Sequence, residues 1–146
     1  MNKAQDIDPE VKASIFQAVE KEPLARKMNM RLLELGLGYS KVQMPYDPDS
    51  MANIYSRAHG GAIFSLIDEA FETASQTGGS IAVALNVNVT YIKSPTSAMI
   101  LMAEAKEISC SRKTATYDIR VTDASQELVA VCQAVAYRTG KPIFQI

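Results

Sequence analysis

The N-terminal segment has the apolar spacing of an amphipathic helix. Apolar residues recur three or four positions apart, at Val11, Ile15, Ala18 and Val19. That spacing places them on one helical face. Asp8 suits the N-cap, Pro9 suits the first helical position, and Pro23 marks the end. We therefore expect a helix from about Asp8 to Glu22, and residues 24–29 can add another turn.

The next segment, residues 30–46, changes to a spacing near two. Its alternating apolar positions are Leu33, Leu35, Leu37, Tyr39 and Val42. Glycines interrupt the alternation at positions 36 and 38, which predicts one strand with a bend or bulge. Residues 47–58 are mostly polar and contain Pro48, so we expect a loop there.

A long apolar helix is predicted within residues 59–79. One broad face carries Ile63, Phe64, Leu66, Ile67, Ala70, Phe71 and Ala74. Glu69 and Glu72 fall on the opposite side, and Asp68 lies at the edge of the apolar arc, beside Phe64 and Phe71. Glycines at 78 and 79 end this helix.

The remaining residues alternate with a period of two and predict four antiparallel strands. Turns are expected at 95–96, 111–112 and 123–127. On the first of these strands we expect one face to carry Val83, Leu85, Val87, Val89 and Tyr91. A helix as apolar as the one predicted within 59–79 must be covered on most of its circumference. A curved sheet of five strands wrapped around it provides this cover. We expect an α+β fold in a single domain, residues 1–146, with a helical N-terminal extension over residues 1–30.

Composition and charge exclude several function classes. The formal net charge is −1 and no basic run is present, so we expect no nucleic-acid partner. No apolar run approaches the roughly 18 residues that span a bilayer, so we expect no membrane partner. The N-terminus lacks the apolar stretch of a signal peptide, which favours a cytoplasmic protein. With 2 cysteines and 1 histidine at no metal-type spacing, we expect no metal site.

The start of the long helix carries the residues best suited to chemistry. Glycines 60 and 61 let the backbone approach a ligand, and free N–H groups at a helix start favour a developing negative charge. Asp68, on the rim of an apolar face, is expected to be partly desolvated and to have a raised pKa. Helix geometry alone favours a solvated surface charge for Asp68. His59, the single histidine, is expected to position the loop.

Two sequence motifs resemble those of a known enzyme family. The first runs from Asn53 through His59-Gly60-Gly61 to Phe64, Leu66 and Asp68, and the second is NVNVTYIKSP at 86–95. Over residues 31–139 the chain resembles hotdog-fold acyl-CoA thioesterases of the phenylacetic-acid-degradation (PaaI-like) family. The spacing from HGG to aspartate is the more specific of the two motifs.

The resemblance implies a hydrolase that converts an acyl-CoA to a carboxylic acid and CoA, with no separate cofactor. It implies a homodimer with one continuous sheet, often paired again into a homotetramer, and an active site across the dimer interface. Asp68 is the expected catalytic carboxylate, as nucleophile or as general base. Asn53 and the Gly60 N–H of the other protomer are expected to hold the thioester and its oxyanion, and His59 to support their loop.

Further residues are expected to bind the substrate. Gly61 lies beside the expected oxyanion site, Phe64 and Phe71 can line an apolar tunnel, and Arg112 and Lys113 can meet the CoA phosphates. Asn86 completes this predicted set and is a candidate for orienting the attacking water.

The sequence departs from the family pattern at two positions. Ala84 stands where some relatives have a serine or threonine that orients the attacking water, and Ser111 replaces the usual glycine before the basic turn residue. Thr77, Ser80 or Asn86 are possible substitutes for that hydroxyl. These departures keep open a non-catalytic acyl-CoA binding or sensing protein. A hotdog dehydratase ranks last, because His59 beside two glycines fits that chemistry poorly.

Overall fold

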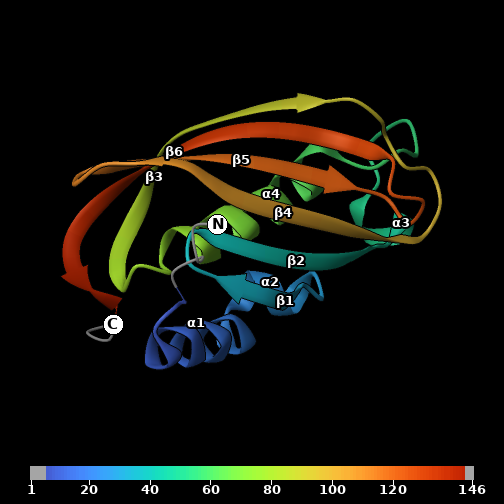
Figure 1. The fold of residues 1–146 in the computed structure, drawn as a ribbon. Coiled ribbons are helices and arrows are strands. Elements are labelled where there is room, and N and C mark those ends of the chain that lie inside the picture. Colours follow the sequence, from blue (N-terminus) through green and yellow to red (C-terminus); the bar gives the residue numbers. More distant parts are fainter. Residues whose placement is uncertain (1–5, 144–146) are drawn as a thin grey trace.

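Antiparallel strands form a curved sheet around a central helix (Figure 1) in a computed structural model that describes residues 6–143. The helices are α1 (Pro9–Lys21), α2 (Pro23–Lys27), α3 (Pro48–Met51) and α4 (Gly60–Ser75). The strands are β1 (Arg31–Gly36), β2 (Tyr39–Tyr46), β3 (Ser80–Tyr91), β4 (Met99–Cys110), β5 (Thr114–Thr122) and β6 (Leu128–Pro142). The strand order is β1-β2-β4-β5-β6-β3, so β1 and β3 are the edges.

Helix α4 lies in the hollow of the sheet and buries most of its circumference, which confirms the predicted α+β arrangement. The apolar stripe of residues 63–74 faces the strands, because this stripe is too wide to be left in water. Phe71 packs edge-on against Tyr117 of β5, with ring centroids 5.5 Å apart. Ser40 of β2 is also buried, and its hydroxyl donates to the Ala70 carbonyl at 2.6 Å.

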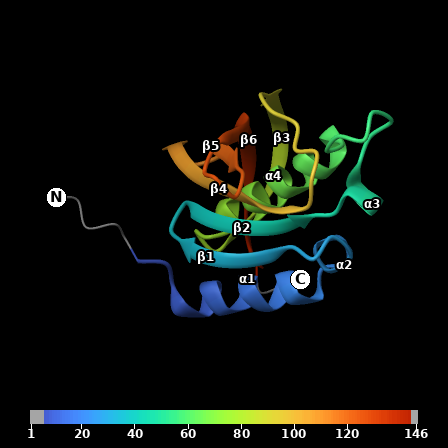
Figure 2. The same ribbon diagram turned by 90° about the vertical axis from the view of Figure 1, so that its right-hand side faces the viewer.

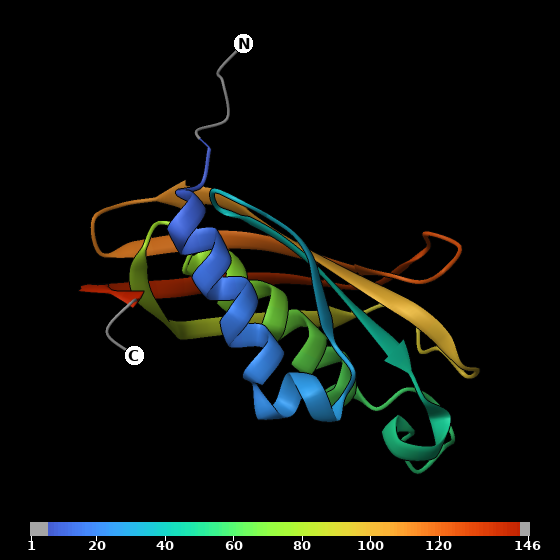
Figure 3. The ribbon, with the colours of Figure 1, turned by 90° about the horizontal axis from the view of Figure 1, so that it is seen from below.

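The N-terminal helices lie outside the sheet, as Figures 2 and 3 show. Asp8 caps α1 by accepting from the Glu10 N–H at 2.8 Å, and Pro9 occupies the first turn, as predicted. α1 buries Val11, Ile15 and Val19, and α2 supplies the expected additional turn. α1 therefore covers part of α4 and β1 that the sheet leaves open. Within residues 6–143, no helix has the length and apolar character needed to cross a membrane.

The segment 31–46 differs from the single bent strand that we predicted. β1 and β2 are two strands of a hairpin, and the sheet has six strands where five were expected. Gly38, at φ +67°, makes the turn in a backbone region that side chains rarely adopt. A bulge between Leu32 and Glu34 is also present, as the glycine-interrupted pattern allowed. Within the predicted loop 47–58, residues 48–51 form the short helix α3.

Strand β3 also departs from the prediction that its five apolar residues share a face. Ala84 pairs with Ala136 and Asn86 with Val135, so Leu85 is an extra residue in a bulge. An inserted residue reverses the alternation. Val87, Val89 and Tyr91 consequently face α4, whereas Val83 lies on the outer face of the sheet. Assigning Val83 to that shared face was therefore wrong.

Candidate active site

The His-Gly-Gly turn is held by the histidine side chain. His59 is the N-cap of α4, and its Nδ1 accepts from the Gly61 N–H at 2.8 Å. Nδ1 is therefore unprotonated, and a neutral ring carries its proton on Nε2. The Gly60 N–H, by contrast, belongs to the first helical turn and has no helical acceptor. Across residues 6–143 no other acceptor takes this hydrogen, so it remains available to a ligand.

Tyr91 fixes the position of Gly60. The Tyr91 hydroxyl, at the end of β3, donates to the Gly60 carbonyl at 3.0 Å. A Cβ at position 60 would lie 3.3 Å from both the Tyr91 Cζ and the hydroxyl oxygen. Glycine is thus suited to this position by the close approach of the aromatic ring.

Asn53 and Gly60 line one pocket, of about 300 Å³. Asn53 Oδ1 accepts from the Tyr55 N–H at 2.9 Å and from the Arg57 N–H at 3.1 Å, which shapes the loop before α4. These contacts occupy Oδ1 and leave the side-chain NH₂ as the group able to donate to a ligand. The other lining residues are Ala58, Ile63, Tyr91, Ile92, Lys93 and Ser94.

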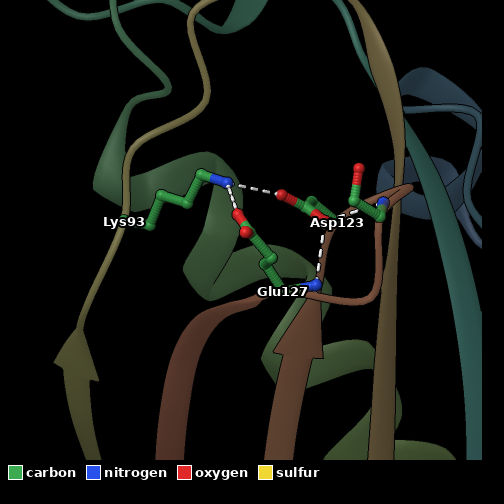
Figure 4. Close-up of polar contacts among 4 residues, drawn as sticks. Lys93, Asp123 and Glu127 are labelled. Atoms are coloured by element: carbon green, nitrogen blue, oxygen red, sulfur yellow. Dashed lines mark hydrogen bonds and ion pairs between the residues drawn. The ribbon is translucent and has the colours of Figure 1, made fainter.

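An ion-pair cluster that sequence reasoning missed borders this pocket (Figure 4). Lys93 donates to Asp123 Oδ2 at 2.8 Å and to Glu127, joining the β3–β4 connection to the β5–β6 turn. The Lys93 ammonium lowers the pKa of Asp123, whose Oδ1 also accepts from the Ser125 and Glu127 N–H groups. Asp123 begins a turn that the sequence predicts, so its hydrogen bonds to backbone N–H groups could be expected. Its ion pair with Lys93, 30 residues earlier, leaves no pattern in the sequence.

Asp68 lies eight residues after Gly60, about 12 Å along α4. Its side chain is exposed, and it is absent from the lining of the Asn53–Gly60 pocket. Desolvation raises the pKa of Asp68, and the negative charge of Glu22 raises it further, in the expected direction. The Asp68 charge also helps to raise the pKa of Cys132, which pairs with Val89 of the edge strand. One protomer therefore does not bring Asp68 together with the Gly60 amide.

The two phenylalanines predicted to bind the substrate have different environments. Phe64 is exposed one helical turn before Asp68, on the same side of α4. Phe71 is only 2% exposed and packs in the core against Tyr117. Phe64 is available to a ligand, whereas Phe71 makes the contacts of a core residue, and its binding role stays a prediction.

The other predicted binding residues lie apart from the Asn53–Gly60 pocket. Arg112 and Lys113 are exposed in the β4–β5 turn. The opposite end of β4, at Met99, pairs with Tyr46 just before α3. β4 has 12 residues, so its two ends lie about 36 Å apart. Asn86 pairs with Val135 and lies on the sheet face turned away from α4.

The candidate substitutes for the missing hydroxyl at Ala84 are mostly engaged in local contacts. The Thr77 hydroxyl is buried, donates to the Ala74 carbonyl at 2.8 Å and accepts from the Gly38 N–H at 2.7 Å. Ser80 Oγ accepts from the Gly140 N–H at 3.1 Å. Ala84 faces the same side of the sheet as Ala136, toward α4. Neither hydroxyl is therefore placed to replace one at position 84.

The carboxylates next to Asp68 form a second acidic group. We predicted Glu69 for the polar side of the helix, but it is only 3% exposed, because the α1–α2 junction covers it. Burial, followed by contact with Glu22, raises the pKa of Glu69 to about 9. Burial of part of its side chain and the charge of Glu22 raise the pKa of Glu72 to about 7, although Glu72 is an exposed residue.

Comparison with known proteins identifies the family. Residues 55–130 match the thioesterase superfamily. The chain belongs to this superfamily. It is 38% identical to an Archaeoglobus fulgidus protein over 120 residues, 82% of this chain and 77% of that protein. It is 27% identical to acyl-coenzyme A thioesterase PaaI of Escherichia coli, over 85% of this chain and 88% of that enzyme.

Solved structures agree with this assignment. The Escherichia coli PaaI structure superposes with a TM-score of 0.86 at 25% identity, covering 91% of this chain and 96% of that one. A Streptococcus mutans protein solved with bound acetyl-CoA superposes with a TM-score of 0.73 at 29% identity, covering 78% and 91% of the two chains. The chain is a PaaI-like hotdog thioesterase, and thus a thioester hydrolase, as the sequence motifs implied.

Proposed function

We propose that this protein hydrolyses an acyl-CoA to the free carboxylic acid and CoA in a site shared by two protomers. The observation that carries the proposal is the separation of Asp68 from the Gly60 amide of its own chain. Each group has the property that the reaction requires: a carboxyl of raised pKa and an N–H without an acceptor. The named activity of the Escherichia coli relative and the acetyl-CoA bound to the Streptococcus mutans protein support the substrate class.

The proposed reaction needs only water. Asp68 takes a proton from the water that attacks the thioester carbonyl, or attacks that carbonyl itself to form an anhydride that water then opens. In both routes the carbonyl oxygen gains negative charge, which the Gly60 N–H stabilises. The carbon–sulfur bond breaks and CoA leaves as the thiolate. The proton released from the attacking water, through Asp68 or through solvent, protonates this thiolate, and Asp68 returns to its ionised form. No cofactor beyond the CoA of the substrate takes part.

Edge strand β3 supports the proposed homodimer. Within residues 6–143 its outer edge pairs with no other strand. Leu85 in its bulge is 59% exposed and Val83 on its outer face is 48% exposed. Exposed apolar edge strands favour pairing with another strand. Pairing two copies of β3 antiparallel around a two-fold axis makes one continuous sheet and turns the two copies of α4 in opposite directions. The Gly60 end of one α4 then approaches the middle of the other, where Asp68 lies.

Proposed substrate contacts follow from the same arrangement. Asn53, through its side-chain NH₂, and Gly61, beside the oxyanion site, contact the thioester. Phe64, on the exposed side of α4, contacts the acyl group. Arg112 and Lys113 are proposed to meet the CoA phosphates of a substrate whose thioester is bound at Gly60 of the other protomer. A further pairing of dimers into a homotetramer, and a cytoplasmic location, stay predictions.

Release of free thiol from short, medium-chain and aromatic acyl-CoAs tests the proposal. We expect steady turnover on at least one of them, and a loss of about 10²–10⁴-fold in kcat for Asp68→Asn. Asp49→Asn, an exposed change in α3, is the matched control and should keep the wild-type rate. Wild-type rates from Asp68→Asn would contradict the proposed role. A monomer by light scattering at micromolar concentration would contradict the shared site.

The non-catalytic alternative rests on Ala84, whose missing hydroxyl neither Thr77 nor Ser80 replaces. Such a protein would bind acyl-CoA saturably and release no thiol. The thiol-release assay, combined with isothermal titration of the protein with an acyl-CoA, distinguishes hydrolysis from binding without hydrolysis. Membership of the thioesterase superfamily favours hydrolysis.

A further inference from the structure

Three carboxylates converge where the α1–α2 junction meets α4. Glu22 is the residue between α1 and α2, and Glu69 and Glu72 lie one turn apart on α4. One oxygen of each carboxylate lies within 4.8 Å of the others. Helices from distant parts of the sequence thus bring their acidic side chains to one point.

Glu69 makes this cluster different from an ordinary acidic surface. The residue is 3% exposed, its carboxylate faces Glu22 and Glu72, and its Oε1 is buried without a hydrogen-bond partner. Within residues 6–143, none of the three carboxylates forms an ion pair with a lysine, arginine or histidine. A buried carboxylate needs a positive partner or a proton, and a bound cation would supply the positive partner that this cluster lacks among the described residues.

A cavity of about 230 Å³ opens beside the cluster, between α1 and α4. Glu22 and Glu72 line it together with apolar residues such as Ile15 and Val19. It gives water and ions a path to the two partly exposed carboxylates. Glu69 lies behind them, in the direction of the core.

We propose that Glu22, Glu69 and Glu72 bind one divalent cation of the hard, oxygen-preferring class, with the dimensions of Ca²⁺. The donors are all carboxylate oxygens, which is the set that Ca²⁺, Mg²⁺ and Mn²⁺ prefer over softer metals. Two oxygens on one Ca²⁺ lie at most about 5 Å apart, and two on one Mg²⁺ at most about 4.2 Å. Three oxygens within 4.8 Å of one another are close enough to share one cation after small side-chain shifts, and the wider Ca²⁺ shell suits this spacing better than the Mg²⁺ shell does.

Such an ion would connect the N-terminal helices to the helix that carries Asp68. Glu22 supplies the ligand from the α1–α2 junction, and the glutamates of α4 supply the others. The ion stabilises the packing of α1 and α2 on α4. The few cysteine and histidine residues led us to expect no metal site, and a site made of carboxylates alone departs from that expectation. The inference does not depend on thioester hydrolysis, because binding and stability can be measured without substrate.

Calorimetric titration of the chelator-treated full chain with CaCl₂ tests the site, with MgCl₂ in parallel. We expect one Ca²⁺ per chain with Kd on the order of 10⁻⁵ to 10⁻³ M, weaker Mg²⁺ binding and a rise in Tm with Ca²⁺. Glu72→Gln and Glu22→Gln, at partly exposed positions, should weaken binding at least about tenfold. Glu20→Gln, an exposed change on α1, is the matched control and should bind like wild type.

Two results would overturn the inference. One is the absence of Ca²⁺ binding up to millimolar concentration in the folded wild-type protein. The other is binding that Glu72→Gln and Glu22→Gln leave unchanged. A shared proton could neutralise the cluster in place of a cation. In that case the Tm of Glu69→Gln will match or exceed that of wild type, and Ca²⁺ will change the Tm of neither protein. This result also contradicts the proposed cation site.

Discussion

The hydroxyl of Tyr91 donates a 3.0 Å hydrogen bond to the carbonyl of Gly60, which links the end of edge strand β3 to the first turn of α4. The two residues belong to the two motifs by which the sequence resembles the family. Their contact gives the second motif a physical role, because Tyr91 holds the backbone whose N–H is proposed to bind the oxyanion. The strand proposed to form the dimer therefore also positions the proposed oxyanion donor.

Tyr91→Phe should reduce catalysis more than stability. The variant keeps the ring beside Gly60 and removes the donor, so we expect kcat to fall several-fold while the free energy of unfolding changes by less than about 1 kcal/mol. Acyl-CoA kinetics and urea denaturation measure the two effects. Tyr137→Phe on β6 is the control and should leave kcat unchanged. Equal kcat values for Tyr91→Phe and wild type would remove the positioning role.

Ser40→Ala should lower stability without changing the candidate active site. The buried Ser40 hydroxyl joins β2 to the Ala70 carbonyl of α4 at 2.6 Å. Loss of this hydrogen bond should cost about 0.5–1.5 kcal/mol in the free energy of unfolding. Urea denaturation measures it, and the exposed change Ser109→Ala on β4 serves as control. A Ser40→Ala variant as stable as wild type would show that this contact contributes nothing.

Much of the fold could be predicted because the period of the apolar residues changes clearly along the chain. Residues 59–75 have the wide apolar stripe of a covered helix, and the segments after Gly79 alternate as strands do. The hairpin at Gly38 and the bulge at Leu85 were missed for a common reason. Apolar residues keep a spacing near two on both sides of the turn and of the inserted residue, so the spacing does not show where the backbone reverses or where the two faces exchange.

The candidate site was less predictable, because its parts come from distant segments. The local spacing marked His59, Gly60 and Asp68. The structure adds that Tyr91 holds Gly60 and that the Gly60 N–H has no acceptor among residues 6–143. The salt bridges of Lys93 and the burial of Glu69 depend on which elements pack together. Periodicity describes one helix at a time, so it assigned Glu69 to the solvent side that the α1–α2 junction covers.

Low pH should weaken the ion pair between Lys93 and Asp123. The ammonium holds the pKa of Asp123 below its usual value of about 3.9. A depressed folded-state pKa contributes stability that is present above the unfolded value and lost as the pH falls through the folded value. The Tm advantage of wild type over Asp123→Asn should thus stay constant from about pH 7 to 5 and shrink below about pH 4. A constant advantage down to pH 2 would contradict this assignment.

The two cysteines should react very differently with a thiol reagent. Cys110 is exposed, whereas Cys132 is buried on β6, and burial raises the pKa of its thiol to about 11. Because the thiolate is the reactive form, labelling of the native protein at pH 8 should modify one thiol per chain rapidly. Cys110→Ser should remove this fast phase, and a denaturant should expose the second thiol. Equal rates for both thiols would contradict the burial of Cys132.

Gly60 offers a way to remove the proposed oxyanion donor. It is the first residue of α4, a position that accepts proline because its N–H has no helical partner. Gly60→Pro should therefore fold and lose about 10²–10³-fold in kcat. Gly60→Ala is the control, because its methyl group also meets Tyr91 at 3.3 Å but the N–H remains. Equal losses in the two variants would assign the effect to the side-chain contact.

Mixed dimers of Asp68→Asn and Gly60→Pro then decide which chains form the site. The two chains are co-expressed with different affinity tags, and the doubly tagged dimer is isolated. If each site combines Asp68 of one chain with Gly60 of the other, the mixed dimer contains one site with both groups intact. It should then have about half of the wild-type kcat per dimer, although both parent homodimers are nearly inactive. If each site uses both residues of one chain, every site in the mixed dimer lacks one group, and its activity should stay as low as that of the parents.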